Sequence, residues 1–191
     1  MITLSKDAQM RKLRYLKTLS SVLLISAATA TFAWNHGISI GYGGGPDLNH
    51  DHDTNSGGFL SAEFLSLVQK NYLNLTFGGS LGQYYSTSAI NKHLFAAALP
   101  FSLRLYPFNT NTIHPFLLAS FGPGYISERK FGENNQASNF AFQTIAGGGF
   151  EFGQEKRVDL NMRFIHYSNA YTMKPNEGFN IFYIVSLGYL F

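Results

Sequence analysis

Strict alternation of apolar and polar residues constrains the fold of this chain more than any other feature. Near the C-terminus one face is apolar at every second position: Phe179, Ile181, Tyr183, Val185, Leu187, Tyr189 and Phe191. The opposite face carries Asn180, Ser186 and Gly188. Successive side chains of a strand point to opposite faces, so this pattern predicts a strand with one apolar and one polar face.

The same alternation recurs along most of the chain, and no sustained helical periodicity competes with it. In the stretch Val158 to Phe164 the even positions are apolar, and the odd positions carry Asp159, Asn161 and Arg163. Strands are predicted near residues 35–44, 58–68, 72–84, 93–106, 113–126, 138–152, 156–168 and 179–191.

The connections between these segments alternate in length. Long polar connections lie at about 45–57, 85–92, 127–137 and 169–178, and shorter ones lie around 69–71, 107–112 and 153–155. Long loops on one rim and short turns on the other are typical of an even-stranded, up-and-down barrel. We therefore predict an all-β fold, an eight-stranded antiparallel transmembrane β-barrel.

A soluble antiparallel sandwich or a lipocalin-like barrel would also alternate. Three features favour a membrane barrel. Charged residues make up only 13% of the chain, where about 25% is usual for a soluble domain. The terminal Phe191 resembles the C-terminal assembly signal of bacterial outer-membrane proteins. Aromatic residues gather near strand ends, as interfacial girdles do: Trp34, Tyr42, Tyr84, Tyr85, Tyr106, Phe108, Tyr125, Tyr167 and Tyr189.

Residues 1–33 read as a secretory signal peptide, with cleavage near Ala30 or Ala33 and the barrel occupying residues 34–191. A basic head precedes an apolar run, Leu19 to Ala33, that is shorter than a spanning helix requires. Five of the 14 basic residues but only one of the 11 acidic residues lie in this segment. The remaining chain has a net charge of about −1, which removes the main support for a nucleic-acid partner.

The stretch "HYSNA" places His166 and Ser168 on one face of the seventh predicted strand. Residues two apart on a strand have α-carbons about 7 Å apart, close enough for an imidazole to reach a hydroxyl. In a barrel whose termini lie on the short-turn side, this strand ends at the extracellular rim. A histidine-activated serine at the outer leaflet and a merely polar strand end both fit this pattern.

"HYSNA", followed by "KPNEG" and a last strand ending in "GYLF", resembles lipid A 3-O-deacylases of the PagL type, which are eight-stranded outer-membrane barrels. The resemblance implies an esterase that removes an acyl chain, at the 3-O position, from lipid A in lipopolysaccharide. It implies that Ser168 is the nucleophile and His166 the base. Asn169, Ala170 and Asn176 would lie in the oxyanion region.

The family's third member, a glutamate that orients the histidine, aligns with Asn180, and the nearest acid is Glu177. Strand parity argues against Asn180, because the alternation places it on the inward face while His166 points outward. Glu177 lies in a loop, where parity does not hold. Both residues remain candidates for the orienting group.

The expected chemistry needs no cofactor and no metal. The partners expected are lipopolysaccharide and the bacterial outer membrane, and the sequence leaves both a monomer and a homodimer open. The alternative is a non-catalytic small outer-membrane barrel acting in adhesion, resistance or membrane integrity. A palmitoyl-transferring barrel is less favoured, because it would not explain "HYSNA".

Two loop motifs lie apart from this constellation. "NHDHDTN" could hold a divalent cation through His50, Asp51, His52 and Asp53, but a solvated extracellular loop explains it as well. "SERK" predicts a second loop, from which Arg129 and Lys130 could contact lipid A phosphates.

Overall fold

The computed structural model describes residues 37–50, 52–108 and 110–191. The predicted signal peptide and Trp34 lie outside these residues. The described ranges form an all-β structure in which no helix is assigned. Within them, no helix is long and apolar enough to span a membrane. The strands are β1 (Gly37–Pro46), β2 (Thr54–Lys70), β3 (Leu73–Ser86), β4 (His93–Ala98), β5 (Phe101–Leu105), β6 (Ile113–Ile126), β7 (Lys130–Phe131), β8 (Asn134–Asn135), β9 (Phe140–Phe152), β10 (Val158–Ser168) and β11 (Phe179–Leu190).

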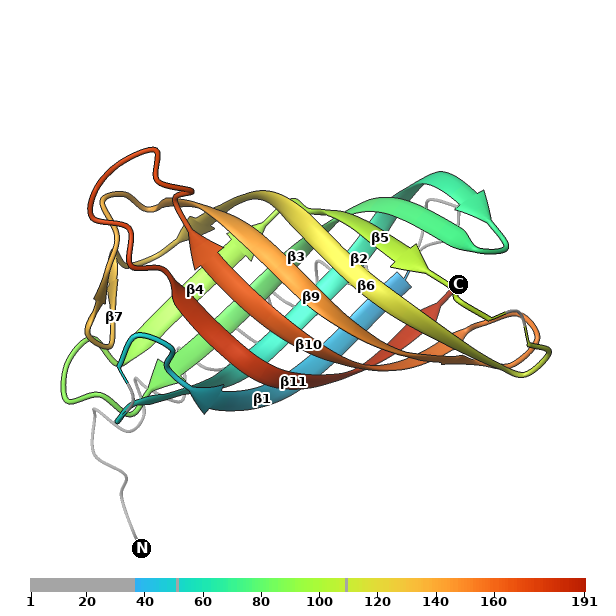
Figure 1. The fold of residues 1–191 in the computed structure, drawn as a ribbon, viewed down its shortest axis with the longest axis horizontal. Helices are drawn as coiled ribbons and strands as arrows, with labels where there is room; N and C mark the ends of the chain where they lie inside the picture. The colour runs from blue at the N-terminus through green and yellow to red at the C-terminus, as the bar shows by residue number, and fades with distance from the viewer. Residues whose placement is uncertain (1–36, 51, 109) are drawn as a thin grey trace, which may run out of the picture. The chain divides into compact units, whose positions relative to one another are not determined.

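Nine of these strands form one antiparallel sheet that closes into a barrel, because β1 pairs with both β2 and β11 (Figure 1). The segments β4 and β5 both pair with β3 and with β6, so together they make one position in the wall. They are separated at Leu99 and Pro100, since proline has no N–H for the ladder. The barrel is thus eight-stranded, and the prediction of fold class is confirmed.

One end of the barrel carries the long connections, and we call it the loop rim (Figure 1). It consists of residues 47–53, 87–92, 127–139 and 169–178. The short hairpin of β7 and β8 lies within the third of these loops. The turns after β2, β5 and β9 and the C-terminus lie at the other end. The predicted alternation of long and short connections is therefore present.

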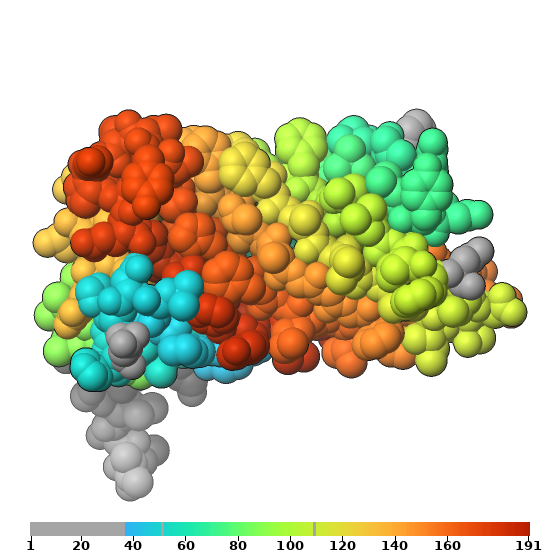
Figure 2. All heavy atoms as spheres, in the orientation of Figure 1, coloured from blue at the N-terminus to red at the C-terminus, as the bar shows by residue number. Residues whose placement is uncertain are grey.

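The outer wall of the barrel is apolar. Along β10, Val158, Leu160 and Met162 are exposed, while Asp159 and Asn161 between them are buried. The same outward row of large apolar side chains continues on β6, β9 and β11, the strands facing the viewer in Figures 1 and 2. Apolar side chains on a water-facing wall would be costly, so this surface suits a lipid environment.

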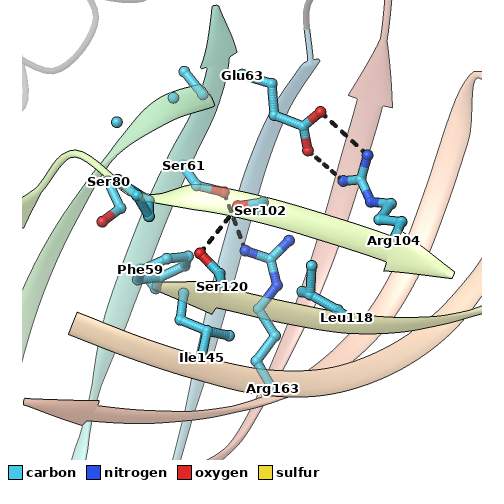
Figure 3. Close-up of a pocket in the computed structure, with 14 residues that line it drawn as sticks. Phe59, Ser61, Glu63, Ser80, Ser102, Arg104, Leu118, Ser120, Ile145 and Arg163 are labelled. Atoms are coloured by element: carbon cyan, nitrogen blue, oxygen red, sulfur yellow. Dashed lines mark hydrogen bonds and ion pairs between the residues drawn. The ribbon is translucent and has the colours of Figure 1, made fainter. Parts of the chain in front are cut away.

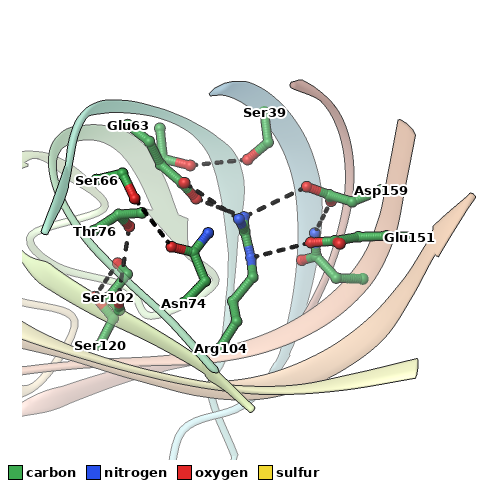
Figure 4. A network of polar contacts seen from close by, with 12 residues as sticks. Ser39, Glu63, Ser66, Asn74, Thr76, Ser102, Arg104, Ser120, Glu151 and Asp159 are labelled. Atoms are coloured by element: carbon green, nitrogen blue, oxygen red, sulfur yellow. Dashed lines mark hydrogen bonds and ion pairs between the residues drawn. The ribbon is translucent and has the colours of Figure 1, made fainter. Parts of the chain in front are cut away.

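The interior holds buried polar and charged side chains beside a cluster of apolar and aromatic ones. Arg104 lies 2.5 Å from Glu63, 3.5 Å from Asp159 and 3.8 Å from Glu151 (Figures 3 and 4). Arg104, Glu151 and Asp159 are each less than 5% exposed. A second cation, Arg163, donates hydrogen bonds to Asn161 Oδ1 and to the hydroxyl oxygens of Ser61 and Ser39. A small barrel filled in this way is a packed plug rather than an open pore.

A β-bulge interrupts the alternation of β11 halfway along its length. Arg163 pairs with Ile184, but Ile165 pairs with Ile181, so β11 has one extra residue at this point. Within the extra segment, Tyr183 has a φ of 51°. Beyond the bulge the parity reverses, and Phe179 and Ile181 are buried. The prediction that they share a face with Tyr183 is therefore wrong.

Candidate active site

The bulge decides which residue faces His166. On the far side of it, Asn180 becomes the direct cross-strand partner of His166, and paired residues of antiparallel strands project to the same side. The His166 Nδ1–H donates a hydrogen bond to Asn180 Oδ1 at 2.7 Å. The parity argument against Asn180 is thus wrong, because it assumed an unbroken strand.

This contact has a chemical consequence for the imidazole. With the Nδ1 proton held by an amide oxygen, the neutral ring carries its lone pair on Nε2. The ring is then oriented with a basic nitrogen available to a neighbouring hydroxyl. Asn180 is itself held in place, because its backbone carbonyl oxygen accepts a hydrogen bond from Asn55 Nδ2 at 3.1 Å.

His166 and Ser168 both lie on the outer face of β10, at its loop-rim end. Both are partly exposed. Tyr167, which lies between them, and Ile165, which precedes His166, are fully buried. β10 ends at Ser168, directly before the loop 169–178. A hydroxyl and an imidazole therefore share the outer wall where the strand meets the rim.

Glu177, the other candidate for the orienting group, is engaged elsewhere. Its side chain is exposed, and its Oε2 accepts a hydrogen bond from the Asn135 N–H at 2.5 Å. The Glu177 N–H in turn donates to the Asn135 carbonyl at 3.2 Å. Of the two residues that the sequence left open, Asn180 is the one in contact with His166.

Gly178 packs against the imidazole, a feature that the sequence pattern did not single out. A Cβ at this position would lie 2.7 Å from His166 Cε1. The residue also has a φ of +68°, which side chains rarely tolerate. A glycine is therefore required here for the ring to sit against the loop.

The predicted oxyanion residues divide into two groups. Asn169 is fully buried and closes the loop: its Nδ2 donates to the carbonyls of Met173 and Pro175, and its backbone N–H donates to Asn176 Oδ1 at 2.8 Å. Ala170 is exposed and has a φ of 53°. Asn169 and Asn176 thus shape the loop, and Ala170 lies on its surface beside Ser168.

A buried polar cluster that sequence reasoning missed ties three loops together behind this site. Asp47 Oδ2 accepts hydrogen bonds from the side-chain amides of Asn55 and Asn134. Asn49 Nδ2 donates to Asn134 Oδ1 at 2.6 Å and to the Glu177 carbonyl at 2.9 Å. Asp47, Asn55 and Asn134 are at most 2% exposed. The cluster therefore fixes the segment from Glu177 to Asn180 against the other loops.

The motif "NHDHDTN" takes part in loop packing, and its cation-binding reading gains no support. His50 Nδ1 lies 3.2 Å from Glu133 Oε2, and the Asp53 carbonyl accepts from the Asp47 N–H. Asp51 lies outside the described residues. Elsewhere in the described ranges, no cluster of three or more histidine and acidic side chains could hold a metal ion.

The fold and the site together define a class: a small closed β-barrel with an apolar outer wall, which has at its loop rim a histidine bonded to an asparagine and, two residues further along the strand, a serine. The family model of the lipid A 3-O-deacylases (PagL) matches residues 57–189. The chain belongs to this family.

Two known proteins are similar to the chain. It is 33% identical over 86 residues to the lipid A deacylase PagL of Pseudomonas aeruginosa, a match that covers 44% of this chain and 49% of that protein. The match thus spans about half the length of the curated relative. The crystal structure of the outer membrane enzyme PagL superimposes with a TM-score of 0.57 at 24% identity, covering 82% of this chain and 99% of that one. At this identity, the likeness concerns the fold.

Proposed function

We propose that the protein is an outer-membrane esterase that hydrolyses the 3-O-linked acyl chain of lipid A. The observation that carries the proposal is the hydrogen bond between His166 and Asn180 on the outer wall, two residues from Ser168. Family membership supports the substrate class. The curated relative's name, lipid A deacylase, supports the reaction.

The chemistry follows from the roles of these groups. The Ser168 hydroxyl attacks the ester carbonyl and passes its proton to His166 Nε2, while Asn180 stabilises the imidazolium through Nδ1. The Ala170 N–H stabilises the oxyanion, and Asn169 and Asn176 hold the loop that carries it. The sugar hydroxyl leaves with the proton from His166. Water, activated by the same base, then releases the fatty acid from Ser168.

The position of the site favours a substrate that stays in the membrane. His166 and Ser168 face outward from the wall, at the level where the apolar surface ends and the loops begin. In an outer-membrane barrel the long loops are extracellular. An ester near the headgroup of an outer-leaflet lipid would therefore meet Ser168 without leaving the bilayer.

Mass spectrometry of lipid A tests the proposal. Expression of the chain in a Gram-negative host whose lipid A carries a 3-O-acyl group should yield lipid A lighter by that one acyl chain, with a free hydroxyl in its place. Cells with an empty vector provide the control. Unchanged lipid A in cells that display the folded barrel would contradict the proposal and favour a non-catalytic barrel.

The orienting role of Asn180 predicts a difference between two single variants. A hydrogen bond to a charged group contributes about 1.5–3 kcal/mol, so Asn180→Ala should lower kcat by about 10- to 100-fold with little change in KM. Glu177→Ala should change kcat by less than about threefold, since the carboxylate contacts Asn135 instead. Steady-state kinetics on purified lipid A would check both. A larger loss for Glu177→Ala would reverse the assignment.

A further inference from the structure

A polar hollow opens on the loop rim beside the proposed active site. It has a volume of 490 Å³ and lies between the loops 87–92, 127–139 and 169–178. Three of its lining side chains are cations, Arg129, Lys130 and Lys174, and one is an anion, Glu128. The hollow therefore has an excess of positive charge, although the chain after residue 33 has a net charge of about −1.

Gln136 lies in the wall of this hollow and is only 2% exposed. Neither its Nε2 nor its Oε1 has a hydrogen-bond partner. Leaving such a group buried and unpaired costs about 1–3 kcal/mol, so it calls for an explanation. Its backbone is well fixed, because its N–H donates to the Arg129 carbonyl at 2.7 Å and it forms a β-bridge with Asn176.

We propose that this hollow binds a phosphorylated sugar of the lipopolysaccharide. Arg129, Lys130 and Lys174 supply the charge that a phosphate requires. The Gln136 amide supplies one donor group and one acceptor, which is what a sugar hydroxyl requires. The inference rests on the proposed function for the identity of the ligand, and it adds a headgroup site separate from the reacting residues.

The hollow is mechanically joined to the proposed active site. Lys174 and Pro175 in its wall belong to the loop that Asn169 closes, and the Ala137 N–H donates to the Pro175 carbonyl at 2.8 Å. Asn176, the bridge partner of Gln136, accepts from the Asn169 N–H. A headgroup held here would anchor the sugar, and so place an acyl ester of the same molecule at the wall near Ser168.

Binding to the Ser168→Ala protein in detergent micelles tests the site without turnover. The variants are Arg129→Ala with Lys130→Ala, and Gln136→Glu, which keeps the side-chain volume but adds a negative charge. Lys92→Ala is the matched control, since it removes a cation from a loop that borders the hollow, at a residue that does not line it. The two ligands are bisphosphorylated lipid A and the same lipid A after removal of its phosphates.

Both variants should bind bisphosphorylated lipid A at least tenfold more weakly, and Lys92→Ala should change its affinity by less than twofold. For the phosphate-free lipid, Arg129→Ala with Lys130→Ala and Lys92→Ala should match the parent, whereas Gln136→Glu should still bind more weakly, because the sugar hydroxyl remains. Equal losses of the double variant on both ligands, or a loss for Lys92→Ala as large as that for the double variant, would overturn the proposal. Retained heat-modifiable gel mobility would show that the variants are folded.

Two further measurements distinguish a lipid A phosphate from free inorganic phosphate as the ligand, and the proposed headgroup site from the proposed esterase activity. Millimolar inorganic phosphate should compete only weakly with lipid A, because the amide and the acyl chains contribute to binding. Full displacement by inorganic phosphate would reject a sugar site in favour of a simple anion site. If the protein binds lipid A in a phosphate-dependent way but leaves it intact, the proposed esterase activity is refuted and the proposed headgroup site is not. If it deacylates lipid A but binds it equally well without phosphates, the proposed headgroup site is refuted and the esterase activity is not.

Discussion

Ser168→Ala is expected to lower the rate of lipid A deacylation by about 10⁴- to 10⁶-fold, to the background rate of membranes that lack the protein. The hydroxyl oxygen forms the covalent bond to the acyl group in the proposed reaction, so its removal eliminates the nucleophile. His166→Ala should be nearly as severe, because the hydroxyl then lacks a base. The double variant should be no worse than either single variant, since the two residues act as one unit.

The measurement is release of fatty acid from purified lipid A in detergent, with binding recorded in parallel. Thr144→Ala is the matched control: Thr144 is exposed on β9, directly across from His166, and also offers a hydroxyl to the outer wall. It should retain activity within about threefold of the parent. If Ser168→Ala kept more than a few percent of the activity while Thr144→Ala lost it, the nucleophile would be Thr144.

The barrel was predictable from the sequence because its determinants are local. Each strand alternates on its own, and the lengths of the connections follow from where turn residues interrupt the pattern. In β10, every position from Val158 to Arg163 has the predicted exposure. The same alternation placed His166 and Ser168 on the outer wall.

The third member of the site was not predictable in this way. One extra residue in β11 reverses the parity of everything before it, and no residue type near Tyr183 marks the bulge. Pairing with β10 determines it, which is a property of two strands rather than of one. The contact between Asn180 and His166 therefore emerged only from the three-dimensional arrangement.

The packing of the loops against one another was also not predictable from the sequence. Asn134 is far in the sequence from Asp47 and Asn55, and aspartate and asparagine are both typical of solvated turns. In the structure they are buried together and hold the segment from Glu177 to Asn180. Composition alone cannot distinguish a polar loop in water from a polar loop that satisfies its hydrogen bonds inside the protein.

Arg104→Met is expected to lower the free energy of unfolding by about 3–5 kcal/mol. Arg104 lies within 4 Å of three acidic residues inside the barrel, Glu63, Glu151 and Asp159. Removing the cation takes away a positive charge that lies within 4 Å of all three carboxylates. Methionine keeps most of the side-chain volume, so the loss would report the charge and its cation–π contact with Phe116 rather than a cavity.

Urea unfolding in detergent, followed by circular dichroism and by gel mobility, would measure the effect. Arg157→Met is the control, because this arginine pairs with Glu155 on the exposed turn after β9 and should change the midpoint little. A second substitution tests the same explanation. Glu63→Gln, made in the Arg104→Met background, removes one of the three negative charges near Arg104 and should restore part of the lost stability. If Glu63→Gln instead destabilised the barrel further in that background, the charge-compensation explanation would be wrong, and Arg104 would contribute mainly through packing.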